Sequence, residues 1–353
     1  MDMACSSDRK TTGSPMKKIA IEEHFFTREH LDHLRTRKGY PRLEIGEDDK
    51  HNKVERLFRT PTSSQAFGVE QVGKLLDIGA GRIADMDNAG IDMQVLSLSG
   101  PGVEELDPAD SVRMARKTND QLAEAIKAHP GRFAGFAALP YGDPQAAAEE
   151  LTRAVTRLGL CGGKINSHVG GQYLDDRKFW VLFKTAESLG VPLYLHPKEP
   201  PPGLLNLLAP YPGLATAMWG FAAEAVLHAM RLICSGLFDA HPKLNIILGH
   251  LGEAIPFWLW RIDNSWQKGP RTFPKNKPSD YFRQNFYVTT SGMLDERTVL
   301  YVYRTLGPER IMFSVDYPYE ANERGAKFFE SLPIEERDKA SICHLNAEKL
   351  LRL

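Results

Sequence analysis

Several apolar stretches of this sequence end in side chains that can bind a metal ion or transfer a proton. These side chains are Glu22, Glu23 and His24 near the N-terminus, His196 and His250 in the second half, and Asp316 near the C-terminus. Carboxylate oxygens and imidazole nitrogens are suitable ligands for divalent ions such as Mn2+ and Zn2+. The same groups act as general acids and bases. Metal-assisted or proton-transfer chemistry is therefore the first hypothesis, provided that the fold brings these residues together.

The stretch KIAIEEHFF at residues 18–26 predicts a strand that presents two ligands. Side chains alternate across a strand, so Glu22 and His24 share one face with Ala20, and Glu23 takes the other face with Ile21. An oxygen and a nitrogen ligand two residues apart suit a divalent metal. We expect Glu23 to point toward the helical layer and to make structural hydrogen bonds. For this stretch alone, a hydrogen-bonded polar pair at a strand end is the preferred alternative.

Eight short β-type runs recur along the chain, with helix-type segments between them. The runs cover residues 18–25, 93–99, 133–140, 162–167, 192–197, 245–250, 286–292 and 311–318. The segment 144–159 begins with Pro and ends with Gly, as helices often do. Eight strand-then-helix units predict one (β/α)8 TIM barrel over residues 17–353, with a C-terminal helix. By count alone, a doubly wound open sheet is the alternative.

The positions of the polar residues favour the barrel. Six of the eight runs carry a polar or ionisable group at or just after their C-terminal end, namely His24, Ser99, His168, His196, His250 and Asp316. In a TIM barrel these ends form one mouth, where the active site lies. The connections 27–70 and 198–213, after the first and fifth strands, are longer than the rest. We expect these mouth-side insertions to be lids or subunit contacts, with the charge run 44–59 a solvated face.

The residues near each histidine in the sequence suggest hydrogen-bond partners for it. Glu253 lies one turn beyond His250 at the expected start of a helix, so its carboxylate can reach the imidazole and fix its tautomer. A helix N-terminal carboxylate favoured by the helix dipole is the simpler, compatible interpretation. For His168, which glycines follow, substrate contact and loop hydrogen bonding are equally supported. A lone His196 is typical of a hydrogen-bonded core residue, but a rim shared with the other candidates favours a metal site.

The composition of the chain narrows the class of partner. Its 353 residues include 44 Lys and Arg against 45 Asp and Glu, a balance that gives no electrostatic case for nucleic acid or a membrane surface. The cysteines, Cys5, Cys161, Cys234 and Cys343, have no disulfide or metal spacing, which favours the reducing cytoplasm. Residues 1–16 are polar and lack the apolar core of a signal peptide, so we expect a disordered or loosely attached tail.

Taken together, the motifs resemble a known family, the amidohydrolase-superfamily decarboxylases that act on ortho-hydroxybenzoates. The matching motifs are ExH at 22–24, YLHP at 194–197, GHLGEAIPFWLWRID at 249–263 and FSVDYPYE at 313–320. This family includes the γ-resorcylate, 2,3-dihydroxybenzoate and 5-carboxyvanillate decarboxylases. The resemblance runs from about residue 18 to the terminal NAEKLLRL, and residues 82–92 and 166–175 look most similar to the carboxyvanillate branch.

The resemblance implies a metal centre and a catalytic dyad. The implied metal ligands are Glu22, His24, His196 and Asp316, and the implied dyad beside Asp316 is His250 with Glu253. The implied metal is Mn2+, with Zn2+ as the alternative. The amidohydrolase type of barrel is implied as well.

The resemblance also implies substrate contacts and an assembly. The implied contacts to a small aromatic carboxylate are Ser99, His168 and Arg261, with Arg261 entering a neighbouring subunit's site in a homodimer or homotetramer. Two departures stand out. The carboxyvanillate branch has alanine where His24 stands, and its loop-one arginine falls near Phe67, so that Arg56 and Arg59 are the candidates to replace it.

Breaking the bond between ring and carboxylate leaves an electron pair on the arene, so we expect the ring carbon to be protonated before CO2 leaves. The implied donor is Asp316. One rival is a metal-dependent hydrolase of an amide or lactone, in which Asp316 takes a proton from metal hydroxide. The lack of a strand-one HxH pair and of a lysine bridging two metals argues against it. A second rival, a non-catalytic metal-stabilised scaffold or binding protein, conflicts with polar groups at so many strand ends.

Overall fold

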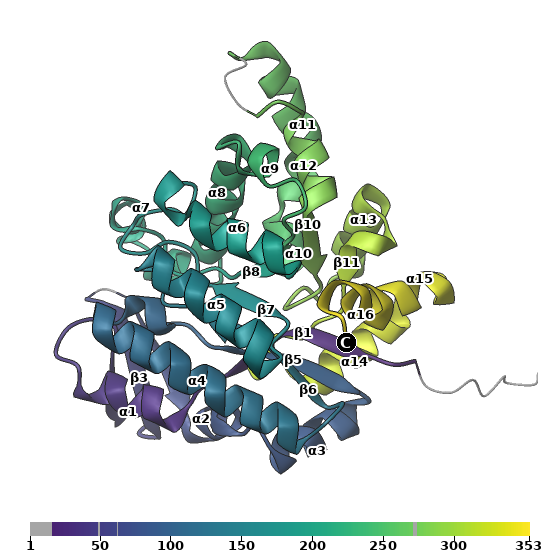
Figure 1. Cartoon of the computed structure of the whole chain (residues 1–353). Helices are drawn as coiled ribbons and strands as arrows, with labels where there is room; N and C mark the ends of the chain where they lie inside the picture. The colour runs from purple at the N-terminus through teal and green to yellow at the C-terminus, as the bar shows by residue number, and fades with distance from the viewer. Residues whose placement is uncertain (1–15, 49, 62, 271–273) are drawn as a thin grey trace, which may run out of the picture.

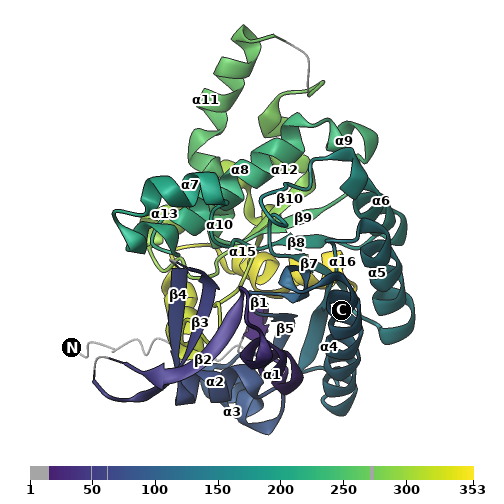
Figure 2. The same ribbon diagram turned by 90° about the vertical axis from the view of Figure 1, so that its left-hand side faces the viewer.

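The computed structural model describes residues 16–48, 50–61, 63–270 and 274–353. Eight parallel strands wrap into a nearly closed barrel with helices outside it (Figures 1 and 2). The strands are β1 (Ile19–Phe25), β5 (Met93–Leu98), β6 (Phe133–Ala138), β7 (Gly162–Ile165), β8 (Leu193–Leu195), β9 (Ile246–Leu248), β10 (Phe286–Thr289) and β11 (Ile311–Met312). Sheet order follows chain order, so the predicted TIM barrel is confirmed. The expected N-terminal tail lies, apart from Met16, outside the described residues.

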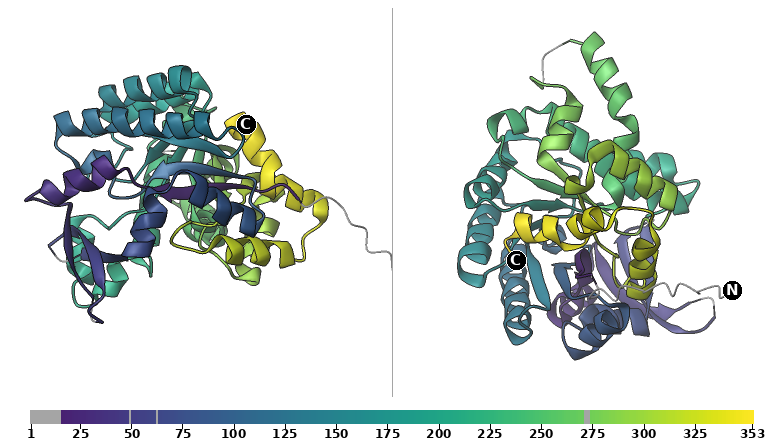
Figure 3. Two further views of the ribbon diagram at one scale, coloured as in Figure 1. Left: turned by 90° about the horizontal axis from the view of Figure 1, so that it is seen from below. Right: turned by 90° about the vertical axis from the view of Figure 1, so that its right-hand side faces the viewer.

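Helices connect the strands and cover the outside of the barrel (Figure 3). The longer ones are α3 (Ala80–Ala89), α4 (Pro108–Ala128), α5 (Pro144–Leu158), α6 (Trp180–Leu189), α8 (Gly220–Cys234), α11 (Ile255–Lys268), α12 (Pro278–Asn285), α13 (Glu296–Leu306) and α14 (Asn322–Ser331). Shorter pieces are α9 (Leu237–Ala240), α10 (His250–Glu253), α15 (Glu336–Ala340), a π-helical turn at Ser341–Leu345 and α16 (Asn346–Leu351). The last of these is the C-terminal helix that the sequence predicts.

Local sequence fixes the ends of α5. The Asp143 side chain accepts hydrogen bonds from the N–H groups of Gln145 and Ala146, and Pro144 occupies the first turn. This is a favourable helix start, because the cap satisfies N–H groups that have no partner within the helix. The helix ends where Gly159 adopts φ 74°, a left-handed conformation that costs glycine little.

A β-bulge in β1 sets the direction of its side chains. The pairing with β5 shifts between Ala20 and Glu23, so Ile21 and Glu22 together oppose one residue of β5. Ile19 and Ile21 therefore pack in the barrel interior with Val95, Ile247 and others, whereas Ala20 belongs to the layer between barrel and helices. The predicted facing of Ile21 and Ala20 is wrong, because strict alternation does not hold across a bulge. Glu22 nevertheless lies on the inner side.

The insertion after β1 contains a small sheet that the sequence analysis did not predict. It runs through α1 (Arg28–Thr36), the antiparallel strands β2 (Arg42–Glu47), β3 (Lys53–Thr60) and β4 (Ser63–Gly68), and α2 (Val69–Leu76). The charge run 44–59 is thus two strands rather than only a solvated face. Val54 and Leu57 of β3 are both buried, and Leu57 packs in a cluster that includes Phe67.

The insertion after β8 is apolar and leads into α8. It contains α7 (Pro202–Leu208) and a short turn at Pro212–Ala215. Among the described residues, one helical segment, Pro212–Cys234, has the length and composition to span a membrane, and 39% of its apolar window is buried in the protein. In α8 the side of the helix that includes Ala225 and Leu232 is buried, which is typical of a barrel's covering helix.

The lowered pKa values of two buried histidines predict how the free energy of unfolding depends on pH. Burial lowers the pKa of His30 to about 4 and that of His228 to about 3, from an ordinary 6.5. The unfolded chain therefore binds protons below pH 6.5 that the folded chain does not, and stability is lost as pH falls from 6.5 toward 4. Each histidine contributes a slope of about 1.4 kcal/mol per pH unit. In urea unfolding between pH 6.5 and 5, His30→Gln should show a shallower slope than wild type. Parallel slopes would contradict this expectation.

Candidate metal and active centre

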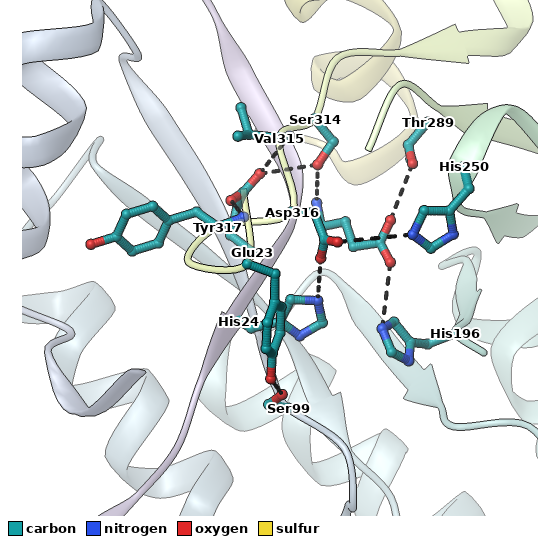
Figure 4. A network of polar contacts seen from close by, with 12 residues as sticks. Glu23, His24, Ser99, His196, His250, Thr289, Ser314, Val315, Asp316 and Tyr317 are labelled. Atoms are coloured by element: carbon teal, nitrogen blue, oxygen red, sulfur yellow. Dashed lines mark hydrogen bonds and ion pairs between the residues drawn. The ribbon is translucent and has the colours of Figure 1, made fainter. Parts of the chain in front are cut away.

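Three potential metal ligands meet at the mouth of the barrel. Glu22 and His24 come from β1, and His196 follows the last residue of β8 (Figure 4). One ligand atom from each lies within 4.8 Å of those of the other two. His196 Nε2 is 3.5 Å from Glu22 Oε1, and the rings of His24 and His196 have centroids 5.0 Å apart. The predicted convergence of strands one and five is confirmed for these residues.

Asp316 borders this trio from the loop after β11. Its Oδ1 is 3.0 Å from His24 Nε2, and its Oδ2 is 4.0 Å from His250 Nε2. Its backbone has φ 81°, a left-handed conformation that is unfavourable for a residue with a side chain. The loop thus places a carboxylate between two imidazoles.

The trio suits a cation better than a hydrogen-bonded polar pair. Glu22 Oε1 and His24 Nε2 are buried and have no hydrogen-bond partner, even though His24 lies 3.0 Å from Asp316. Leaving such atoms unpaired costs free energy, which an ion between them would recover. Burial and the nearby Lys164 charge lower the pKa of both His24 and His196, which keeps these imidazoles neutral, as ligation requires. Mixed oxygen and nitrogen donors fit a divalent ion such as Mn2+ or Zn2+.

His250 and Glu253 form the predicted dyad, at a separation of 2.6 Å between Nδ1 and Oε1. The backbone differs from the expected helix start: His250, Leu251 and Glu253 have φ between 47° and 55°, and α11 begins only at Ile255. Glu253 thus lies just before the N-terminus of α11 and not within its first turn. A tight left-handed turn, with Gly252 at φ 77°, brings the carboxylate back to the ring.

The pKa values of His250 and Asp316 are shifted in opposite directions. Burial opposes a charge on His250, but the negative charges of Glu253 and Glu22 prevail and raise its pKa well above the ordinary value. Burial likewise opposes a charge on Asp316, but the closeness of His24 and His250 lowers its pKa. The site thus holds a protonated imidazole beside an ionised carboxylate.

Ser99 reaches the site through a tyrosine that the sequence analysis missed. Its Oγ lies 2.6 Å from the hydroxyl oxygen of Tyr319. The rings of Tyr319 and His24 form a T-shaped pair with centroids 5.2 Å apart. Tyr319 stands three residues after Asp316, so its place in the same loop was the available signal.

A buried lysine also lies behind the site. Lys164 on β7 places Nζ 3.3 Å from His24 Nδ1 and donates to the carbonyl of Leu98. Burial lowers its pKa to about 8. It approaches the ring nitrogen that faces away from Asp316, so it is not placed as a bridge between two metal ions. A lysine inside an apolar run was the sequence signal for it.

Both ring nitrogens of His168 make hydrogen bonds to nearby backbone groups. Its Nδ1 accepts from the N–H of Gly171, and its Nε2 lies 3.0 Å from the carbonyl oxygen of Glu199. Of the two alternatives, this conformation corresponds to loop hydrogen bonding. Arg59, a candidate for the missing loop arginine, forms an ion pair with Glu199 at 2.8 Å.

Arg261 takes part in none of the site contacts described above. It is exposed on α11, which projects away from the barrel in Figures 1 and 2. The same helix exposes Phe257 and Trp260, which are 65% and 76% accessible.

Comparisons with known proteins agree with the family resemblance of the sequence motifs. The family model described as amidohydrolase matches residues 72–353. A γ-resorcylate decarboxylase from Polaromonas sp. strain JS666 is 38% identical over 351 residues, covering 95% of this chain and 98% of the relative. A crystal structure of dihydroxybenzoic acid decarboxylase from Polaromonas sp. JS666, with bound manganese and the inhibitor 2-nitroresorcinol, has a TM-score of 0.83 at 38% identity, covering 96% and 97% of the two chains.

A second solved structure represents the other branch of the resemblance. The 5-carboxyvanillate decarboxylase from Sphingomonas paucimobilis has a TM-score of 0.84 at 36% identity, covering 96% of this chain and 99% of that one. At 36% identity, this structure is slightly less similar in sequence to the chain than the Polaromonas decarboxylase at 38%.

Proposed function

Because this chain belongs to the amidohydrolase family, and because its barrel mouth gathers Glu22, His24 and His196 beside Asp316, we propose that it is a divalent-metal-dependent decarboxylase of an ortho-hydroxybenzoate. The reaction is a non-oxidative carbon–carbon lyase reaction that yields a phenol and CO2. One observation carries the proposal: the three potential metal ligands lie next to the Asp316 carboxylate, and the His250–Glu253 dyad lies on the other side of that carboxylate.

The proposed ligands are Glu22, His24, His196 and Asp316, and the proposed metal is Mn2+, with Zn2+ as the alternative. When bound, the ion would neutralise and orient the substrate's carboxylate and adjacent phenolate oxygen. The orphaned atoms Glu22 Oε1 and His24 Nε2 support this set. So does the manganese in the Polaromonas relative.

The proton for the ring carbon comes from the Asp316 side of the site. His250 holds a proton and Glu253 keeps it there, with His250 Nε2 4.0 Å from Asp316 Oδ2. When a dianionic substrate binds, its charge raises the pKa of Asp316 and favours the transfer of this proton to the carboxylate. Asp316 then acts as the general acid.

The proton moves from Asp316 to the ring carbon that bears the carboxylate and forms a new C–H bond, which interrupts aromaticity. The bond between that carbon and the carboxylate then breaks, its electron pair returns to the ring, and CO2 departs. Ser99 and His168 are the proposed substrate contacts, with Tyr319 beside Ser99 at 2.6 Å.

A substrate panel tests the function. The Mn2+-loaded protein should release CO2 from at least one of γ-resorcylate, 2,3-dihydroxybenzoate and 5-carboxyvanillate, but not from 4-hydroxybenzoate, which lacks the ortho hydroxyl. No CO2 from any member, together with hydrolysis of amides or lactones, would replace the proposal by the metal-hydrolase alternative.

We also propose that the active unit is a homodimer or homotetramer in which Arg261 enters a neighbouring subunit's site. Exposed aromatic side chains on α11, including Phe257 and Trp260, support a subunit interface there. The three cysteines that the structure describes are free, in keeping with the proposed cytoplasmic compartment.

Arg261→Ala should weaken substrate binding and raise KM about tenfold with an unchanged circular dichroism spectrum, because a charged hydrogen bond to the substrate is lost. Complementation tests the subunit arrangement. Mixing Arg261→Ala with Asp316→Asn and allowing subunits to exchange should give roughly a quarter of wild-type activity at substrate concentrations far below KM, since half of the dimers are mixed and each mixed dimer regains one intact site. No restoration would place Arg261 and Asp316 in the same chain's site or would remove Arg261 from the reaction.

A further inference from the structure

The conformation of Asp316 requires support from its surroundings. A φ of 81° is unfavourable for a non-glycine residue, and such a conformation persists only where neighbouring groups hold it. The strand β11 ends at Met312, so no regular ladder extends to this loop. Another part of the molecule must fix the carboxylate in place.

The side chain of Glu23 provides that support. Its Oε1 accepts hydrogen bonds from the hydroxyl of Ser314 and the N–H of Val315, both at 3.0 Å, and its Oε2 accepts from the N–H of Tyr317 at 2.8 Å (Figure 4). The two backbone donors stand on either side of Asp316. The carboxylate therefore spans the left-handed residue and fixes both of its peptide neighbours.

These bonds complete the closure of the barrel. Between β1 and the chain after β11, the backbone contacts are Ile21 N–H to Phe313 O at 3.2 Å and His24 N–H to Tyr317 O at 2.8 Å. Between them, the N–H of Glu22 donates to the Ser314 hydroxyl at 2.7 Å. Side chains thus replace ladder bonds at the seam that joins Glu22 and His24 to Asp316.

We propose that Glu23 is a positioning residue for the metal centre and the proton donor. Its carboxylate holds the loop so that Asp316 faces His24 and His250, and it keeps Asp316 in register with Glu22 on the neighbouring strand. The part that concerns proton donation rests on the proposed decarboxylase function. The part that concerns the metal does not depend on the substrate.

The chemistry requires a carboxylate at this position. Three donors converge on Glu23, which is 0% exposed, so every contact needs an acceptor. In Glu23→Gln, one oxygen becomes an NH2 group that faces at least one N–H donor, and that buried donor loses its partner. The side chain keeps its size, so the change acts on the hydrogen bonds and not on packing.

The test compares Glu23→Gln with Glu150→Gln. Glu150 is another buried carboxylate, 5% exposed, bound to Asn119 and Arg153 on the outer helices. In Glu23→Gln, kcat should fall and the Mn2+ dissociation constant should rise, each by roughly 10- to 100-fold, with KM changed much less. Glu150→Gln should match wild type in both. Mn2+ titration followed by electron paramagnetic resonance measures the affinity without substrate.

Wild-type kcat and Mn2+ affinity in Glu23→Gln would overturn the proposal, and so would equal losses in Glu150→Gln. If Glu23→Gln does not fold, Ser314→Ala removes one of the three donors and should cause a smaller loss in the same direction. No change of Mn2+ affinity in that variant would then contradict the proposal. Should wild type decarboxylate nothing in the panel, the proposed function fails while the Mn2+ titration still decides the role of Glu23.

Discussion

Asp316→Asn is expected to lose decarboxylase activity by about 1000-fold or more while the protein stays folded, because an amide cannot supply the proton that the ring carbon needs. The substitution preserves shape, so the loop after β11 keeps its hydrogen bonds to Glu23. Steady-state CO2 release gives the rate, and circular dichroism gives the fold. An unchanged rate would remove Asp316 as the proton donor.

Asp143→Asn is the matched control for this change. Asp143 caps α5 and makes none of the site contacts described above, and asparagine caps helices about as well as aspartate does. Its activity should equal that of wild type. If both variants lose activity equally, the loss in Asp316→Asn would reflect stability rather than chemistry.

Removal of the metal is the second large effect that we expect. Dialysis against a chelator should reduce activity by at least roughly 100-fold, and Mn2+ should restore it, because Glu22 and His24 then lose the ion that pairs with their free atoms. The melting temperature should rise again on adding Mn2+, since an ion at 100 times its dissociation constant stabilises the folded state by about 2.7 kcal/mol. Metal content and activity are measured on the same samples.

Glu22→Gln should behave like chelated protein but without recovery on adding Mn2+, and its loss should exceed that of Glu23→Gln. Full activity in protein that contains no measurable divalent metal would contradict the metal-dependent account. Equal damage from the two glutamine variants would contradict the assignment of Glu22 to the inner face of the barrel and Glu23 to the outer one.

The barrel could be predicted because its strands are short apolar runs with polar residues at one end. The small sheet β2–β3–β4 could not be, since β3 has only a few apolar residues, such as Val54 and Leu57, within a charged segment. The burial of Leu57 depends on packing against Phe67 and other residues in the same cluster, and that packing is not visible in the local pattern. Tertiary contacts therefore decide this sheet.

At the site, the sequence identified the residues but not the backbone that aims them. The bulge at Ile21 and Glu22 and the positive φ angles of His250 and Asp316 have no sequence signature, because none of these residues is glycine. Long-range hydrogen bonds such as those of Glu23 impose these conformations. The roles of His168 and Arg261 stay predictions, because a substrate and a partner subunit are needed to define them.

The central claim is decarboxylation with protonation at the vacated carbon, and proton NMR in D2O tests it most directly. Mn2+-loaded protein is incubated with γ-resorcylate, 2,3-dihydroxybenzoate or 5-carboxyvanillate. The account predicts a phenol that carries deuterium only at the carbon that bore the carboxylate, and no such product from Asp316→Asn. Substrate that remains intact in every case, or a product hydrolysed at another bond, would contradict it.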